Sequence, residues 1–88
     1  MNSSLRDKRV KLILKILELS EEEGEDILLS EILKHVGNER ELVNELKQFE
    51  ALPPRIVISK LLYEPKWKTS IRMASEIYLQ KRYNQQVS

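Results

Sequence analysis

A helical repeat of large apolar side chains dominates the first quarter of the chain. Four of these side chains share the i, i+3, i+4, i+7 spacing of one helix face: Val10, Ile13, Leu14 and Leu17. This spacing predicts a helix over residues 5–19. Four more apolar residues fall on the adjoining face: Leu5, Leu12, Ile16 and Leu19. One partner helix cannot cover a stripe this wide, so the helix either lies at the centre of a core or contributes surface to an interface.

Both ends of this first helix carry sequence signals. Ser4 is the predicted N-cap, with Asp7 three residues later as its capping-box partner. Gly24 is the predicted stop, because glycine readily adopts the left-handed conformation that ends helices. The acidic run at residues 21–23 is unfavourable beside the negative end of the helix dipole, so we expect the last turn to fray.

Two short helices are predicted in the middle of the chain. The first covers residues 31–36, with Ser30 as its N-cap and Gly37 as the residue that ends it. The second opens with a capping box at Asn38 and runs to Ala51, where two consecutive prolines close it.

Residues 55–63 combine β-branched side chains with a helical spacing of Val57, Leu61 and Leu62. We predict a helix, because Pro54 suits a first helical turn and Pro65 follows a natural end. A β-hairpin over residues 55–70 is the alternative, and it would make the fold a winged helix. Its connection lacks the glycine or asparagine of tight hairpin turns.

The last predicted helix begins at Thr69 or Ser70 and ends near Tyr83. Its predicted inward-facing residues are Ile71, Ala74, Ile77 and Tyr78. Residues 84–88 are polar and are expected to form a disordered tail. The sequence therefore predicts an all-α fold, a single domain of four to five helices over residues 1–83.

Length and composition restrict the kind of protein further. A chain of 88 residues buries only about 60–65% of its unfolded surface as one domain, so its stability depends on apolar packing. The absence of cysteine excludes disulfides and thiolate zinc sites. We find no signal-peptide pattern and no apolar run of about 20 residues. We therefore expect a cytoplasmic protein that does not enter the membrane.

Charge alternates in three blocks along the sequence. Residues 1–15 carry five basic residues against one acidic, residues 16–52 carry three against eleven, and residues 53–88 carry seven against two. An acidic middle therefore lies between two basic ends, although the net charge is only +1.

The sequence shows no constellation of catalytic or metal-binding residues. The one histidine, His35, forms only an i, i+4 pair with Glu31, which is too little for a zinc site. The acidic run 21–26 lacks the spacing of a calcium loop. No nucleophile has a base partner and no glycine-rich loop could hold a phosphate. We therefore expect a non-enzymatic protein with no cofactor, no metal and no small-molecule ligand.

The segment 29–47 resembles a helix-turn-helix, with two short helices joined by a turn at Gly37 and Asn38. Four apolar residues match the positions of that family: Ile32, Val36, Val43 and Leu46. Leu33 departs from the small residue usual where the two helices cross, and Asn38 departs from an apolar position. The resemblance implies a three-helix core whose second helix enters the major groove of DNA.

The negative charge of that second helix argues against its binding in the major groove of DNA. Its exposed positions are net negative: Glu39, Arg40, Glu41, Asn44, Glu45 and Lys47. Phosphates would repel such a surface. We interpret the segment as a structural core and expect any nucleic-acid contact at the basic ends. The candidate residues are Arg6, Arg9, Lys11, Lys66, Lys68, Arg72, Lys81 and Arg82.

The apolar side chains are too many for so short a chain to bury, which is typical of a partner-binding face. The candidate interface residues are Leu12, Ile16, Leu19, Ile56, Leu62, Tyr63 and Trp67. Trp67, between two lysines, could instead stack on a base or anchor the last helix in the core.

As a whole, the chain resembles the small helical accessory subunits of archaeal family B DNA polymerases. The resemblance covers length, helical content and charged, cysteine-free composition, with residues 8–19 and 71–82 its best examples. It implies a subunit that docks on a DNA polymerase and steadies the complex on DNA. The alternatives are a helix-turn-helix transcriptional regulator and an acidic protein that mimics nucleic acid.

Overall fold

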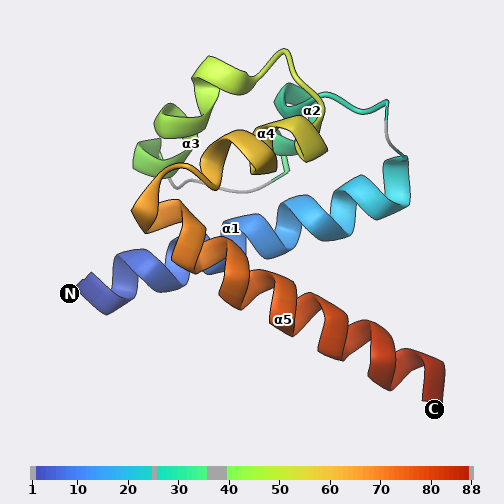
Figure 1. The fold of residues 1–88 in the computed structure, drawn as a ribbon. Helices are drawn as coiled ribbons and strands as arrows, with labels where there is room; N and C mark the ends of the chain where they lie inside the picture. Colours follow the sequence, from blue (N-terminus) through green and yellow to red (C-terminus); the bar gives the residue numbers. More distant parts are fainter. Residues whose placement is uncertain (1, 25, 36–39, 88) are drawn as a thin grey trace.

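The computed structural model describes residues 2–24, 26–35 and 40–87, and every regular element within them is helical (Figure 1). The elements in chain order are α1 (Asn2–Glu23), α2 (Leu29–Leu33), α3 (Arg40–Leu46), the 3-10 turn η1 (Lys47–Phe49), α4 (Pro54–Leu61) and α5 (Pro65–Val87). The predicted all-α fold is confirmed. None of the described helices is long and apolar enough to cross a membrane.

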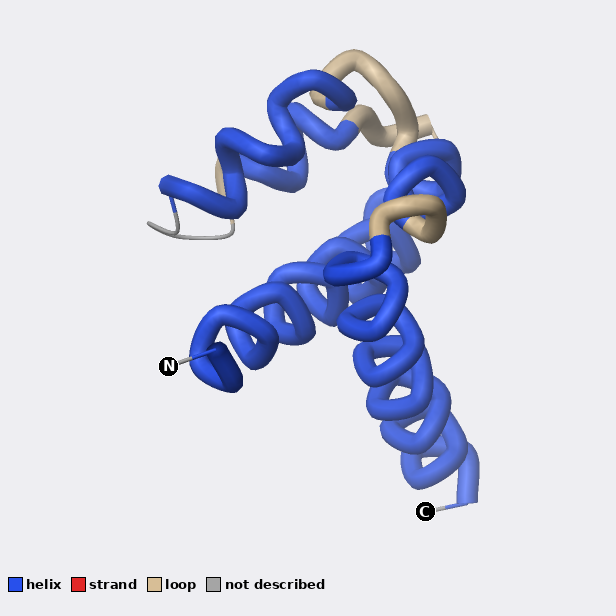
Figure 2. Tube along the Cα trace, turned by 60° about the vertical axis from the view of Figure 1, so that its left-hand side comes forward, coloured by secondary structure: helices blue, strands red, loops and turns tan. Residues whose placement is uncertain are grey.

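Two long helices and a cluster of short ones make up the fold. The helices α1 and α5 cross each other in their N-terminal halves, and their backbones diverge towards the C-terminal ends (Figures 1 and 2). The short helices α2, α3 and α4 lie together on the other side of α1 (Figure 1). The central position of α1 explains its wide apolar stripe, because α5 covers one part of it and the short helices cover another.

The core draws side chains from every α-helix. The fully enclosed apolar residues are Ile13, Ile16, Leu29, Ile32, Leu42, Leu46, Val57 and Ala74, with Leu61 and Trp67 almost as buried. Together they form one continuous cluster, so the whole described chain packs as a single domain.

The predicted end of α1 is confirmed and its predicted start is wrong. Gly24 has φ of +91° and donates its N–H to the carbonyl of Ser20 at 3.0 Å, which closes the helix. Ser4 lies inside α1 and not before its first residue, since the helix already begins at Asn2. A serine inside a helix costs only a few tenths of a kcal/mol relative to alanine, so its presence does not define the start.

The start of α2 is stabilised by tertiary hydrogen bonds and not by the predicted cap. The helix begins at Leu29, so Ser30 lies within its first turn. The N–H groups of Leu29 and Ser30 donate to the carbonyls of Leu52 and Glu50, at 2.8 and 3.0 Å. These bonds satisfy donors that a side-chain cap would otherwise satisfy, and they fasten α2 to the turn after η1.

The middle helix ends earlier than predicted, because α3 tightens into the 3-10 turn η1 after Leu46. The N–H groups of Glu50 and Leu52 then bond to the carbonyls of Lys47 and Phe49 in the same tight pattern. The turn predicted at Gly37 and Asn38, together with Val36, lies outside the described residues.

The helix predicted after the two prolines is confirmed as α4, and the hairpin alternative over residues 55–70 is wrong. The last helix begins at Pro65, earlier than predicted. Thr69 and Ser70 do not cap it, because their hydroxyls donate to carbonyls four residues back within α5. The helix continues to Val87, beyond its predicted end near Tyr83.

Candidate protein-interaction site

Three of the predicted interface residues are exposed on α4 and on the turn that follows it. Ile56 and Leu62 are 38% and 39% exposed, and Tyr63 is 90% exposed. We call Ile56, Leu62 and Tyr63 the α4 patch. Helical hydrogen bonding continues just past α4, from Leu62 N–H to the Ile58 carbonyl and from Tyr63 N–H to the Lys60 carbonyl. Ile56 and Tyr63 therefore lie two turns apart on one side.

The opposite side of α4 explains why this patch faces solvent. Val57 and Leu61 are buried in the core, and Pro54 begins the helix from a buried position. A helix of eight residues cannot bury all of its circumference against one cluster, so the side of α4 that carries Ile56 faces solvent.

The other four predicted interface residues lie elsewhere. Leu12, Ile16 and Trp67 are in the core, at 6%, 0% and 2% exposure, so they offer no surface to a partner in this structure. Leu19 is half-buried and lines a groove next to α2. Of the seven predicted interface residues, only the three around α4 are exposed.

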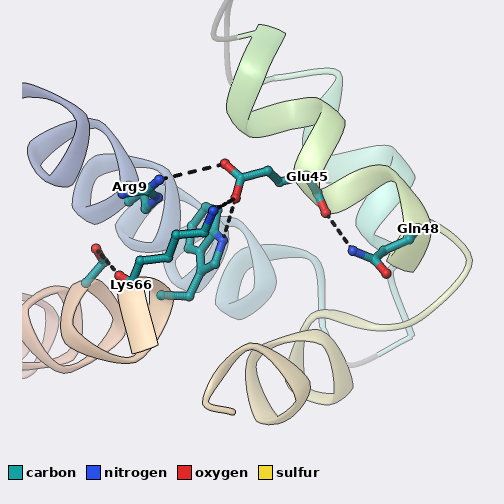
Figure 3. A network of polar contacts seen from close by, with 6 residues as sticks. Arg9, Glu45, Gln48 and Lys66 are labelled. Carbon is teal, nitrogen blue, oxygen red and sulfur yellow. Dashed lines mark hydrogen bonds and ion pairs between the residues drawn. The ribbon is translucent and has the colours of Figure 1, made fainter. Parts of the chain in front are cut away.

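Trp67 belongs to a polar network that joins α1, α3 and α5 (Figure 3). Its indole Nε1 donates to Glu45 Oε1 at 3.2 Å, and Lys66 Nζ lies 2.9 Å from the same oxygen. Arg9 Nη2 lies 4.0 Å from Glu45 Oε2, and its guanidinium stacks over the Trp67 ring, 5.5 Å from the centroid. We call Arg9, Glu45, Lys66 and Trp67 the Glu45 network.

The network changes the interpretation of the helix-turn-helix segment. Glu45 belongs to the predicted DNA-facing surface of the second helix, but its carboxylate points towards α1 and α5 (Figure 3). Leu42 and Leu46 face the core from the same helix, while Arg40 and Asn44 are exposed. Glu45, which was predicted to face DNA, therefore contacts α1 and α5 of its own chain instead.

Some of the predicted nucleic-acid residues also pair within the chain. Lys81 Nζ lies 3.8 Å from Glu18 Oε1, and Arg82 Nη1 lies 2.9 Å from Glu21 Oε1. Tyr78 donates its hydroxyl proton to Glu21 as well. These contacts place positive charge beside the acidic C-terminal end of α1, which offsets the unfavourable helix dipole there.

The remaining predicted basic residues are exposed: Arg6, Lys11, Lys68 and Arg72. None of the four forms an ion pair within the described part of the chain. Their charges are therefore not neutralised by the fold, and two of them, Lys68 and Arg72, lie one turn apart on α5.

Sequence reasoning missed two surfaces. One is a solvent-open groove of about 640 Å³ between the C-terminal end of α1 and α2, with Leu19, Ile27 and Ile32 among its lining residues. The other is the free end of α5, where Ile77, predicted to face inward, is 40% exposed, and Leu79 and Tyr83 are 64% and 60% exposed. The i, i+4 spacing of Leu79 and Tyr83 was the sequence signal available for this second surface.

Comparisons with known proteins do not extend this description. No family model, curated protein or solved structure matches the chain. Within residues 2–24, 26–35 and 40–87 there is also no group of three or more side chains suited to hold a metal ion.

Proposed function

We propose that this chain is a non-enzymatic protein-interaction module, an accessory subunit that docks on a DNA polymerase and steadies the complex on DNA. The α4 patch is the proposed docking surface and carries the proposal. Exposed aromatic side chains such as that of Tyr63 are enriched where proteins bind one another.

The exposure of Tyr63 is the main support for docking. At 90% exposure its ring makes almost no contact with its own chain, and the aliphatic side chains of Ile56 and Leu62 are also more than one third exposed. Burying such a ring on a partner stabilises a complex by removing apolar area from water, and its hydroxyl can still find a hydrogen-bond partner.

The unneutralised cations on α1 and α5 support the DNA component. Lys68 and Arg72 are available for phosphates, since neither pairs with a carboxylate in the described residues. Contacts of this kind hold a complex on DNA without selecting a sequence. They suit a subunit that follows an enzyme along its template.

Replacing Tyr63 by aspartate is expected to weaken docking on the family B polymerase of the same organism by about 30-fold or more, as for an aromatic hot spot. The dissociation constants are measured by isothermal titration calorimetry with both purified proteins. Tyr83→Asp is the matched control, because Tyr83 is also an exposed tyrosine but lies on α5, and we expect its affinity to equal that of the unmodified chain.

Binding of the Tyr63→Asp variant as tight as that of the unmodified chain, or no binding by any variant, contradicts the docking proposal.

The helix-turn-helix alternative makes a different prediction. It expects sequence-specific DNA binding that is lost on Arg40→Ala and Asn44→Ala, even without a polymerase.

The double variant Lys68→Ala/Arg72→Ala is expected to weaken DNA binding of the polymerase complex evenly across sequences. Two lost phosphate contacts should reduce the slope of log affinity against log salt by about 2. Fluorescence anisotropy over a salt series measures this slope. Arg40→Ala is the control, and an unchanged slope in the double variant would exclude these two residues as phosphate contacts.

A further inference from the structure

The groove beside α2 has an apolar floor and an acidic rim. Leu19 of α1 and Ile27 of the following loop are half-buried along it, and Ile32 of α2 closes it from within the core. Three carboxylate residues, Glu23, Asp26 and Glu31, line it, together with Lys15 and the single histidine. The groove therefore fits an apolar side chain that arrives with positive charge around it.

The free end of α5 has this chemistry. Its backbone diverges from α1 towards the C-terminal end (Figure 1), although Tyr78, Lys81 and Arg82 still contact α1. It presents Leu79 and Tyr83 to solvent on successive turns. From Arg72 to its end, α5 carries three basic residues and one acidic residue. Lys81 and Arg82 remain 57% and 47% exposed although they pair with α1, so their charges are accessible to a neighbouring molecule.

The two surfaces lie on different parts of the molecule. The groove uses Leu19 and Glu23 at the C-terminal end of α1, whereas α5 contacts Glu18 and Glu21, which lie on another side of the same helix. A chain with a receptor surface at one place and a matching ligand surface at another associates head to tail, and repetition produces rings or open chains.

We propose that the groove binds the free end of α5 from a second copy of this chain, with Leu79 and Tyr83 against Leu19, Ile27 and Ile32. The carboxylates at the rim attract the basic end of the incoming helix. Association is therefore concentration-dependent and weakens as salt screens the charges. This contact is separate from the α4 patch, so each surface can operate without the other.

Sedimentation equilibrium of the full chain tests the proposal, because the average mass should rise above 10.4 kDa as concentration increases. Tyr83→Asp removes the ligand surface, and Glu23→Arg/Asp26→Arg reverses the rim charge. Each variant alone should associate at least about tenfold more weakly. Glu41→Arg/Glu50→Arg makes the same charge change at exposed sites away from the groove and should associate like the unmodified chain.

An equimolar mixture of the two deficient variants gives the decisive measurement. One variant keeps an intact α5 end and the other keeps an intact groove, so the mixture should form a complex of two chains and stop there. A chain that stays monomeric at all concentrations, or a mixture that forms no such complex, overturns the proposal. Loss of association on Tyr63→Asp also overturns it, since the contact would then use the α4 patch. None of these results tests whether the chain docks on a polymerase, so the two proposals can fail independently.

Discussion

Replacing Trp67 with alanine is expected to remove a large part of the stability of this chain. The side chain is 2% exposed and lies in the core between α1, α3 and α5. Deleting a buried tryptophan costs about 3–5 kcal/mol in lost burial and cavity formation. A domain of this length has an unfolding free energy of about 4–13 kcal/mol, so a large part of it is lost. Urea unfolding followed by circular dichroism measures the shift in midpoint.

Two further substitutions separate the contributions of Trp67. Trp67→Phe keeps an aromatic ring under Arg9 but leaves Glu45 without the indole donor, so its midpoint should lie between those of the unmodified chain and the alanine variant. Tyr63→Ala is the surface control and should change the unfolding free energy by less than about 0.5 kcal/mol. An alanine variant at Trp67 as stable as this control would show that the indole is not a core residue.

Replacing Glu45 with alanine is expected to lower the unfolding free energy by about 2 kcal/mol, because one carboxylate serves three helices. Its loss leaves the Trp67 N–H without its acceptor and Lys66 and Arg9 without their counter-charge. Arg9 is the more sensitive cation, since its side chain is only 11% exposed and its buried Nε has no hydrogen-bond partner among the described residues. Losing one partner of such a group costs more than the contact itself stabilises.

Glu45→Gln and Glu41→Ala are the informative controls for this prediction. The glutamine keeps an oxygen for the indole N–H and removes the charge, so the difference between Gln and Ala measures the neutral hydrogen bond. Glu41 is an exposed acidic residue on the same helix, and its replacement should be nearly neutral. If all three variants unfold at the same urea concentration as the unmodified chain, Glu45 does not hold the helices together.

The helices were predictable from sequence because apolar residues at helical spacing form the face that each helix buries in the core. The spacing of Val10 and Ile13 indicated α1, and the prolines before Arg55 and after Tyr63 framed α4 despite its β-branched residues. The caps were less predictable. Ser30 has the right side chain for an N-cap, but the carbonyls of Glu50 and Leu52 already accept the first N–H groups of α2, and such tertiary bonds leave no local pattern.

The candidate site was predictable only in part, for the same physical reason. Exposure of Tyr63 and burial of Trp67 depend on how α4 and α5 rotate against the core, and both residues look alike in sequence as aromatic side chains near lysines. The pairing of Lys81 and Arg82 with Glu18 and Glu21 depends on α1 and α5 lying side by side. An acidic run and a basic run separated by about 60 residues contain no local sign that they meet.

The pairing of α1 with α5 also determines the order in which the molecule can be built. The core positions Ile13 and Ile16 on α1 are made early, whereas Ile71 and Ala74 on α5 are among the last core residues to leave the ribosome. The short helices between them depend on contacts closer in sequence and can associate sooner. Until α5 has been made, one side of α1 stays uncovered and exposed to aggregation or to chaperones, so we expect the core to be completed only once α5 can pack against α1.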